Sequence, residues 1–405
     1  MIAIQIKGHT ASVSNPFVAY RSFRNFSHEN FVNDLEQIDF ELLIDQEQDV
    51  NVAYEKFETV YMEVNDKPIP LKQRKKINKP TPFMNKELRK AIYLKNMFFN
   101  KYNKIRSNEN WELYRKQRNQ VNKIKRNSVR NYFLEICVGG PKDKDFWPTI
   151  KPFLTNKGSH FENNVILSKD GEIINNQAEV AETFNDYLVN VAKDIGAVSR
   201  SVDQDHPSIK AISEHVHLDN EMEFKPIQTT LVEQPIYKIG IKKATGKDCI
   251  SVKTLKLSNP TIAKPITMLI NKSFEQCEFP KKLKEAQVVP LHKKNSQLEV
   301  GNYRPVSILP AISKTFERAI YTQLLKFFDN IFHPYLSAFR PGYGCNTVLM
   351  KIIEGWKKAI DKNKYIAAVF MDLSKAFDCL PHDLLLLKMK MYGLSDSACT
   401  KLSVR

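Results

Sequence analysis

The residues around position 372 have the types and order that a metal-dependent phosphoryl-transfer site would need. An unbroken apolar run from Tyr365 to Met371 is followed directly by Asp372 and Leu373. Its β-branched and aromatic members predict a buried central strand that would hold the carboxylate rigidly. A carboxylate and the backbone carbonyl of Leu373 are hard oxygen ligands of the kind that Mg²⁺ prefers. Two such ions, about 4 Å apart, can hold the attacking and leaving oxygens of a nucleotidyl transfer. The alternative is an aspartate that only caps the following turn.

Apolar periodicity predicts the elements that would position this run. From about residue 226, helical patterns alternate with short apolar strands, which is typical of a mixed α and β domain. We expect helices over residues 177–192, 228–242, 260–275, 311–328 and 346–361, a strand over 288–291, and a last helix from Pro381 to Gly393. A tight turn containing Gly171 predicts a hairpin before the first of these helices.

All of the net positive charge lies in one segment. The chain carries +16, and residues 72–130 alone hold 19 Lys and Arg against three Glu, which is again +16. Two long helices are expected over residues 84–135, because apolar residues recur there at helical spacing. The basic faces suit a phosphate backbone, although a solvated helix without a partner is the alternative. The candidate nucleic-acid contacts are Arg115, Lys116, Arg118, Lys123, Lys125, Arg126 and Arg130.

Composition divides the chain into four expected segments. Residues 29–66 hold twelve Asp and Glu against one base, Lys56, and proline pairs follow this stretch. The segments are an acidic helical part (1–70), a basic helical linker (71–140), a connector (141–225) and the mixed domain (226–405). The expected fold class is α+β, with a helical, basic N-terminal half.

Several blocks of the mixed domain resemble the reverse transcriptase domain of jockey-like, non-LTR (LINE-type) retrotransposons. The matching blocks, in the order the family has them, are KATGKDCI at 243–250, a fingers strand at 288–294, NYRPVSIL at 302–309, SKTFER at 313–318, LSAFRPGYGCNT at 336–347 and MDLSKAFD at 371–378. Cys249 stands where the family usually has glycine. The resemblance implies a partial right-hand polymerase, with fingers and the first part of the palm. More loosely, residues 14–150 resemble the segment that follows the endonuclease in such elements.

The resemblance also implies roles around the first catalytic block. Asp372 would be the catalytic metal ligand, with the carbonyl of Leu373 as a second ligand. Phe377 would lie under the sugar of the incoming nucleotide, where a bulky ring excludes a ribose 2′-hydroxyl. Asp378 would either orient the turn or contact the metal weakly.

Basic residues of the fingers would bind the nucleotide and the template. Arg304 would contact the triphosphate, because a planar, permanently charged guanidinium suits phosphate oxygens. Its alternative is a surface ion pair with Glu299. Either Lys293 or Lys294 would act beside Arg304. Arg340 would line the template path or simply pack within the fingers.

The implied partners are an RNA template, a DNA primer or target, and deoxynucleotides, with Mg²⁺ as the family's cofactor. No Asp-Asp dipeptide occurs in the sequence, and 33 residues follow Asp372. We therefore expect a reverse transcriptase truncated after its first catalytic motif, which does not hold Mg²⁺ productively and is inactive alone, because one carboxylate cannot hold two Mg²⁺ ions. The alternatives are a non-catalytic nucleic-acid-binding protein derived from the element, and a non-functional product of a decayed element.

Other function classes find no support in the sequence. No apolar run is long enough to predict a membrane span, and residues 1–10 lack the pattern of a secretory signal. The six cysteines form no CxxC pair, so neither a zinc ribbon nor a disulfide framework is indicated. We expect an intracellular protein, in the cytoplasm or nucleus, without a membrane partner. The sequence indicates no particular oligomeric state.

Overall fold

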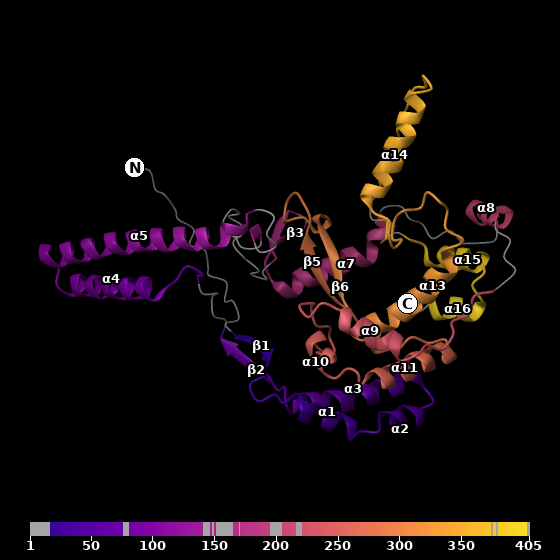
Figure 1. The fold of residues 1–405 in the computed structure, drawn as a ribbon, viewed down its shortest axis with the longest axis horizontal. Coiled ribbons are helices and arrows are strands. Elements are labelled where there is room, and N and C mark those ends of the chain that lie inside the picture. Colours follow the sequence, from indigo (N-terminus) through magenta and orange to yellow (C-terminus); the bar gives the residue numbers. More distant parts are fainter. Residues whose placement is uncertain are drawn as a thin grey trace. The chain divides into compact units, whose positions relative to one another are not determined.

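The computed structural model describes residues 17–75, 81–140, 146–147, 150, 165–169, 171–194, 205–215, 221–373, 376–377 and 380–402. Its contacts divide the chain into two compact units, which are described separately below (Figure 1). Unit 1 comprises residues 1–20 and 72–164, and unit 2 comprises residues 21–71 and 165–405. The acidic residues 21–71 are therefore grouped with the mixed domain, whereas the sequence had suggested a segment of their own.

Unit 1 is built around a helical hairpin of α4 (Lys86–Lys104) and α5 (Asn108–Ile136). Asn85 Oδ1 accepts a hydrogen bond from the Leu88 amide at 2.7 Å and so caps α4. The two helices pack through aromatic pairs, Phe99 with Tyr114 and Tyr102 with Trp111, each with ring centroids 5.1 Å apart. These rings fill the interface between the helices, as expected for an apolar stripe at helical spacing. A two-stranded sheet pairs β1 (Phe17–Arg21) with β2 (Leu71–Lys75).

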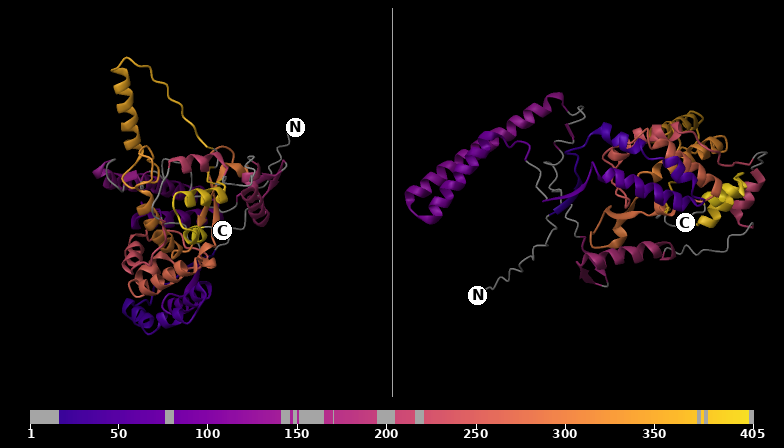
Figure 2. Two further views of the ribbon diagram at one scale, coloured as in Figure 1. Left: turned by 90° about the vertical axis from the view of Figure 1, so that its right-hand side faces the viewer. Right: turned by 90° about the horizontal axis from the view of Figure 1, so that it is seen from below.

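Unit 2 has one large core in which the acidic helices pack against the helices of the mixed domain (Figures 1 and 2). The helices that surround this core are α1 (His28–Glu36), α2 (Phe40–Asp45), α3 (Val50–Asp66), α9 (Thr230–Lys238), α10 (Val252–Leu257), α11 (Ala263–Gln276), α12 (Lys281–Lys284), α13 (Ser313–Phe328), α15 (His382–Met391) and α16 (Asp396–Leu402). Phe31, Phe57 and Tyr61 are fully buried against Ile266, Leu269 and other side chains of α9 to α13. The helices predicted over residues 228–242, 260–275 and 311–328, and from Pro381 to Gly393, are thus confirmed, although α9 is shorter than expected.

Polar contacts join the acidic helices to the basic edge of α11 and α12. Lys264 pairs with Glu41 at 2.5 Å, and Lys282 pairs with Glu58 at 2.9 Å. The Lys272 ammonium donates to the carbonyl oxygen of Ile44 at 3.1 Å. Opposite charge therefore accompanies the apolar packing along this contact.

A smaller cluster supports the second sheet of unit 2. The hairpin of β3 (Leu167–Lys169) and β4 (Glu172–Ile174) and helix α7 (Gln177–Asp194) bury Leu167, Val180 and Phe184. The ring of Tyr303 contacts this cluster, edge-on to Phe184 at 5.1 Å. The predicted hairpin and the helix that follows it are confirmed. A further helix, α8 (Pro207–His215), packs against α15.

The predicted strand over residues 365–371 is wrong. Within the described chain, these residues form no strand, and Val369, Phe370 and Met371 are 84%, 83% and 89% exposed. Helix α14 (Cys345–Ile360) precedes the segment and also has no buried residue. An apolar run becomes a strand only when a neighbouring strand takes up its backbone hydrogen bonds, and the described part of the chain places none beside it.

Among the helices that the structure describes, none is both long enough and apolar enough to cross a membrane.

Candidate nucleotide-binding face and nucleic-acid surfaces

The register of one antiparallel ladder brings two predicted phosphate ligands to the same face. Strand β5 (Gln287–His292) pairs with β6 (Tyr303–Ile308), and Leu291 lies directly opposite Arg304. The Lys293 amide donates to the carbonyl oxygen of Asn302 at 2.9 Å, which extends the ladder by one residue. Side chains two residues apart share a face of a strand, so Lys293 lies on the face of Leu291 and Arg304. Lys294 follows in a bend, outside this alternation.

The guanidinium of Arg304 is exposed and is not neutralised by the neighbour that the sequence suggested. Glu299 Oε2 accepts a hydrogen bond from Asn302 Nδ2 at 2.9 Å. Among the described residues, no carboxylate lies within ion-pair distance of Arg304. Leu291 and Val306, on the same face, are 46% and 41% exposed. The face therefore presents two cations beside an apolar surface.

The opposite face of the ladder is packed at its Tyr303 end, whereas Val288, farther along the same face, is 47% exposed. The His292 and Tyr303 rings meet edge-on at 5.4 Å, and the Tyr303 hydroxyl donates to the carbonyl oxygen of Gln297 at 2.7 Å. Because Tyr303 also contacts Phe184, this face anchors the hairpin to the smaller cluster. Lys293 and Arg304 lie on the other face, away from these contacts.

Asp372 lies in the exposed segment that follows α14. Among the described residues, no group of three or more His, Cys, Asp or Glu side chains is gathered in a way that could hold a metal ion. Mg²⁺ in phosphoryl-transfer sites is usually held by one or two carboxylates together with substrate phosphates. The role of Asp372 and the Leu373 carbonyl as Mg²⁺ ligands therefore stays a prediction. Asp378 lies outside the described residues.

Phe377 is 79% exposed and meets the ring of Phe339 edge-on at 6.1 Å. Phe339 is itself 84% exposed and has a backbone φ of +61°. This pair is a contact between the 336–347 block and the first catalytic block.

Arg340 is engaged locally. Its side chain is 13% exposed and pairs with Asp329 at 3.1 Å. Its guanidinium also lies over the rings of Tyr343, at 4.7 Å, and Phe332, at 5.5 Å. These contacts favour the packing role of Arg340 over a role in lining the template path. Both roles stay predictions.

The loop of the 243–250 block packs closely against the end of β6. A Cβ atom on Gly246 would lie 2.7 Å from the backbone nitrogen of Pro310. Asp248 follows, half-buried, and its Oδ2 has no hydrogen-bond partner among the described residues. Burial raises the pKa of the Asp248 carboxyl to about 6, and the nearby Glu58 adds to this effect. The block could be recognised in the sequence, but only the structure shows that Asp248 is half-buried.

The predicted contacts on α5 form an exposed basic surface. Val121 and Ser128 are buried in unit 1, whereas all seven candidate Lys and Arg residues are exposed. Arg115, Lys116, Lys123, Arg126 and Arg130 fall on one side of the helix, opposite the buried residues, because α-helices repeat every 3.6 residues. A hollow of about 500 Å³ runs along this helix beside Lys125, Arg126 and Arg130.

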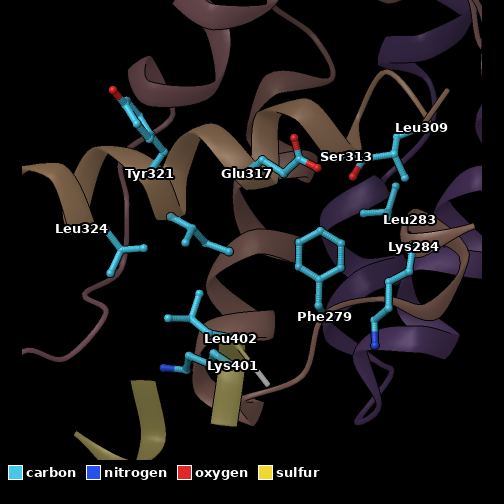
Figure 3. Close-up of a pocket in the computed structure, with 11 residues that line it drawn as sticks. Phe279, Leu283, Lys284, Leu309, Ser313, Glu317, Tyr321, Leu324, Lys401 and Leu402 are labelled. Carbon is cyan, nitrogen blue, oxygen red and sulfur yellow. The ribbon is translucent and has the colours of Figure 1, made fainter. Parts of the chain in front are cut away.

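A separate hollow of about 360 Å³ lies between α13, the segment around Phe279, and α16 (Figure 3). Its lining is mainly apolar, with Phe279 and Leu324 among its side chains, and Glu317 reaches its edge. Burial raises the pKa of the Glu317 carboxyl. None of the predicted nucleotide ligands lines this hollow, so it does not form part of the candidate site.

Residues 291–403 match the family described as reverse transcriptase (RNA-dependent DNA polymerase). A protein from Drosophila funebris described as RNA-directed DNA polymerase from mobile element jockey is 24% identical over 67% of this chain and 29% of its own length. Two Drosophila melanogaster proteins are described as probable RNA-directed DNA polymerases. The one from transposon BS is 25% identical over 71% of this chain and 32% of its own length, and the one from transposon X-element is 31% identical over 43% and 19%.

The chain thus contains a reverse transcriptase domain, and its fold mixes helices and strands. Its resemblance to the reverse transcriptases of jockey-like, non-LTR retrotransposons is confirmed. The chain spans less than a third of the length of each of these three relatives.

Proposed function

We propose that this chain supplies the nucleotide-binding fingers of an RNA-directed DNA polymerase from a non-LTR retrotransposon. The observation that carries the proposal is the ladder register, which puts Lys293 and Arg304 on one exposed face within the family-matched region. Arg304 would grip phosphate oxygens of the incoming deoxynucleotide through its two-pronged guanidinium, and Lys293 would neutralise a second phosphate. Of the two lysines, the register favours Lys293 over Lys294.

The proposed catalytic carboxylate is Asp372, with the Leu373 carbonyl beside it. Mg²⁺, when bound, would stabilise the negative charge of the reacting phosphate. Since Asp372 belongs to no group of three or more His, Cys, Asp or Glu side chains among the described residues, the proposed active protein needs further acidic residues to complete the metal site. Phe377 would exclude a ribose 2′-hydroxyl, and its edge-on contact with Phe339 would help to hold its ring in place. The expected intracellular location, where RNA template and deoxynucleotides are present, belongs to the same proposal.

A second candidate function is nucleic-acid binding without catalysis. The observation that favours it is the exposed basic side of α5, opposite the face that packs against α4. Single-stranded or duplex nucleic acid would follow this side through its phosphates, and the affinity would fall steeply with salt. Both functions can belong to one protein, because a polymerase must also hold its template and primer.

Primer extension on an RNA template tests the two candidates together. The purified chain is incubated with labelled primer–template, deoxynucleotides and Mg²⁺ or Mn²⁺, alongside Asp372→Asn. We expect salt-sensitive binding of primer–template and no extended product from either protein. Extension that depends on Asp372 would show that the metal site is complete without further residues. Failure to bind primer–template at low salt would contradict both candidate functions.

A further inference from the structure

Two polar rows face each other across a hollow between α9 and α13. Thr230, Gln234 and Lys238 follow one another at four-residue spacing along α9, and Lys314, Arg318 and Thr322 do so along α13. Residues four apart lie on the same side of a helix, so each triplet forms one row. All six line the same hollow of about 480 Å³, within the size range of ligand sites.

The three cations of this hollow have no ion-pair partner in the described part of the chain. Lys238, Lys314 and Arg318 take part in none of its ion pairs, and no acidic residue lines the hollow. Arg318 lies over the ring of Tyr321 at 5.1 Å, which orients its guanidinium without neutralising it. Lys314 is half-buried, and Asp248 and Glu317 are within its electrostatic reach, but neither lines the hollow. Three positive charges in a hollow whose lining contains no acidic residue favour an anionic ligand.

The rest of the lining is apolar. The other lining residues are Leu231, Pro235, Ile239 and Ala319. A ligand bound here would therefore contact apolar side chains as well as charged ones. A phosphate that carries a sugar fits such a lining better than a bare ion does. The guanidinium of Arg318 suits two oxygens of one phosphate, and the Thr230 hydroxyl can donate to a third. The Thr322 hydroxyl already donates to the carbonyl oxygen of Arg318 at 2.8 Å.

We propose that the hollow between α9 and α13 binds the phosphodiester backbone of an RNA strand. The site takes one nucleotide unit, with its phosphate between Lys238, Lys314 and Arg318 and its sugar over Pro235 and Ala319. This hollow lies on α9 and α13, whereas the candidate nucleotide-binding face lies on β5 and β6 and the basic surface lies on α5. The proposed RNA contact is therefore additional to both. The choice of RNA as the occupant rests on the proposed function, whereas the anion site rests on the hollow itself.

The test is equilibrium binding of a short, labelled single-stranded RNA to the full chain at several salt concentrations between about 50 and 200 mM. The triple variant Lys238→Gln, Lys314→Gln, Arg318→Gln removes the three charges. Each phosphate contact on a single strand contributes about 0.7 to the slope of log affinity against log salt. Because the site holds one phosphate, the slope is expected to fall by about 0.7. The affinity at low salt should fall about 10-fold or more.

A matched variant, Lys242→Gln, Lys326→Gln, Lys362→Gln, removes the same charge from exposed positions outside the hollow. It should keep most of the affinity and slope. Gln234→Glu provides a second probe, because it places a negative charge in the hollow at an exposed position, and it should weaken binding without altering the thermal midpoint. Equal losses in the two triple variants would overturn the site, as would full affinity in Gln234→Glu.

Competition distinguishes the source of the phosphate. Unlabelled RNA should displace the probe from the unaltered chain far better than inorganic phosphate or a mononucleotide at equal phosphate concentration. Equal displacement by inorganic phosphate would overturn the backbone assignment. If the unaltered chain binds RNA and the triple variant binds it equally well, this site is wrong while the proposed function stands. If the unaltered chain binds no RNA, both are wrong.

Discussion

The hydroxyl of Tyr61 lies 2.8 Å from Oγ of Ser258, in a fully buried contact between residues 197 positions apart. Tyr61 belongs to the acidic helix α3, and Ser258 follows α10 in the mixed domain. Burial raises the pKa of the Tyr61 hydroxyl, so the group stays neutral. The contact joins the acidic helices to the mixed domain within unit 2.

Replacing Tyr61 by Phe should lower the free energy of unfolding by about 1 kcal/mol, the usual contribution of a buried hydrogen bond. Ser258→Ala should have a similar effect, and the double variant should show an interaction energy of roughly 0.5–1 kcal/mol. Urea denaturation measures all three. Tyr54→Phe is the matched control, because the buried Tyr54 hydroxyl has no hydrogen-bond partner among the described residues. That change should be neutral or stabilising, and a loss equal to that of Tyr61→Phe would contradict the assignment.

Gly246→Ala should destabilise unit 2 by about 1–3 kcal/mol, because the new methyl group would overlap the backbone of Pro310. The overlap would push the loop away from β6, so the register that aligns Lys293 with Arg304 should loosen as well. Gly240→Ala is the control, since its nearest neighbour would be the Lys243 side chain at 3.9 Å. Thermal unfolding of both variants checks this, and equal midpoints would speak against the close approach.

Cys249→Gly should raise the free energy of unfolding by roughly 0.5–1 kcal/mol. Cys249 has a φ of +56°, in the left-handed region where a side chain is strained and glycine is not. Cys345→Gly serves as the comparison, because Cys345 lies in the first turn of α14 and should gain nothing from the change. Chemical denaturation under reducing conditions measures both. A loss of stability in Cys249→Gly would mean that the thiol contributes more than the strain removes.

The raised pKa of Asp248 should make stability depend on pH. Its ordinary value is 3.8, and burial raises it to about 6 in the folded chain. The folded state therefore holds the proton more tightly, so this contribution is fully present below pH ~4 and is lost as pH rises through ~6. The total is on the order of 2–3 kcal/mol, since the pKa of about 6 already includes the lowering by Lys314.

Denaturation of the unaltered chain and Asp248→Asn at several pH values tests this. The stability of the variant relative to the unaltered chain should rise between pH ~4 and ~6 and level off above. For Glu285→Gln, the stability relative to the unaltered chain should instead fall as pH rises, because the ion pair with Lys247 lowers the pKa of the Glu285 carboxyl. If the free energy of unfolding changes with pH in the same way in Asp248→Asn and in the unaltered chain, burial does not raise the pKa of Asp248.

Elements with strong apolar periodicity could be predicted from the sequence. The helices at α7, α11 and α13 appear close to their expected positions, because an amphipathic stripe must face a core wherever that core lies. The family blocks likewise located Arg304 and Asp372. The structure also explains why the family usually has glycine at position 249, because Cys249 has a positive φ there.

Features that depend on distant partners could not be predicted in this way. The Tyr365–Met371 run has the composition of a strand, but strand formation depends on a neighbour that its own residues do not specify. The burial of Asp248 depends on how the 243–250 loop lies against the rest of unit 2. Which of Lys293 and Lys294 accompanies Arg304 depends on the pairing register, since a shift of one residue would exchange them.

Binding of a fluorescent deoxynucleoside triphosphate, with Mg²⁺ present, tests the central claim most directly. Arg304→Gln and Lys293→Gln each remove a cation from the proposed face, while Lys294→Gln removes the same charge one residue away. We expect the first two changes to weaken binding by about 10-fold or more, as loss of a charge-assisted hydrogen bond implies, and the third to change it less than about 2-fold. If Lys294→Gln instead abolishes binding while Lys293→Gln leaves it intact, the nucleotide does not bind on the face that the β5–β6 register defines.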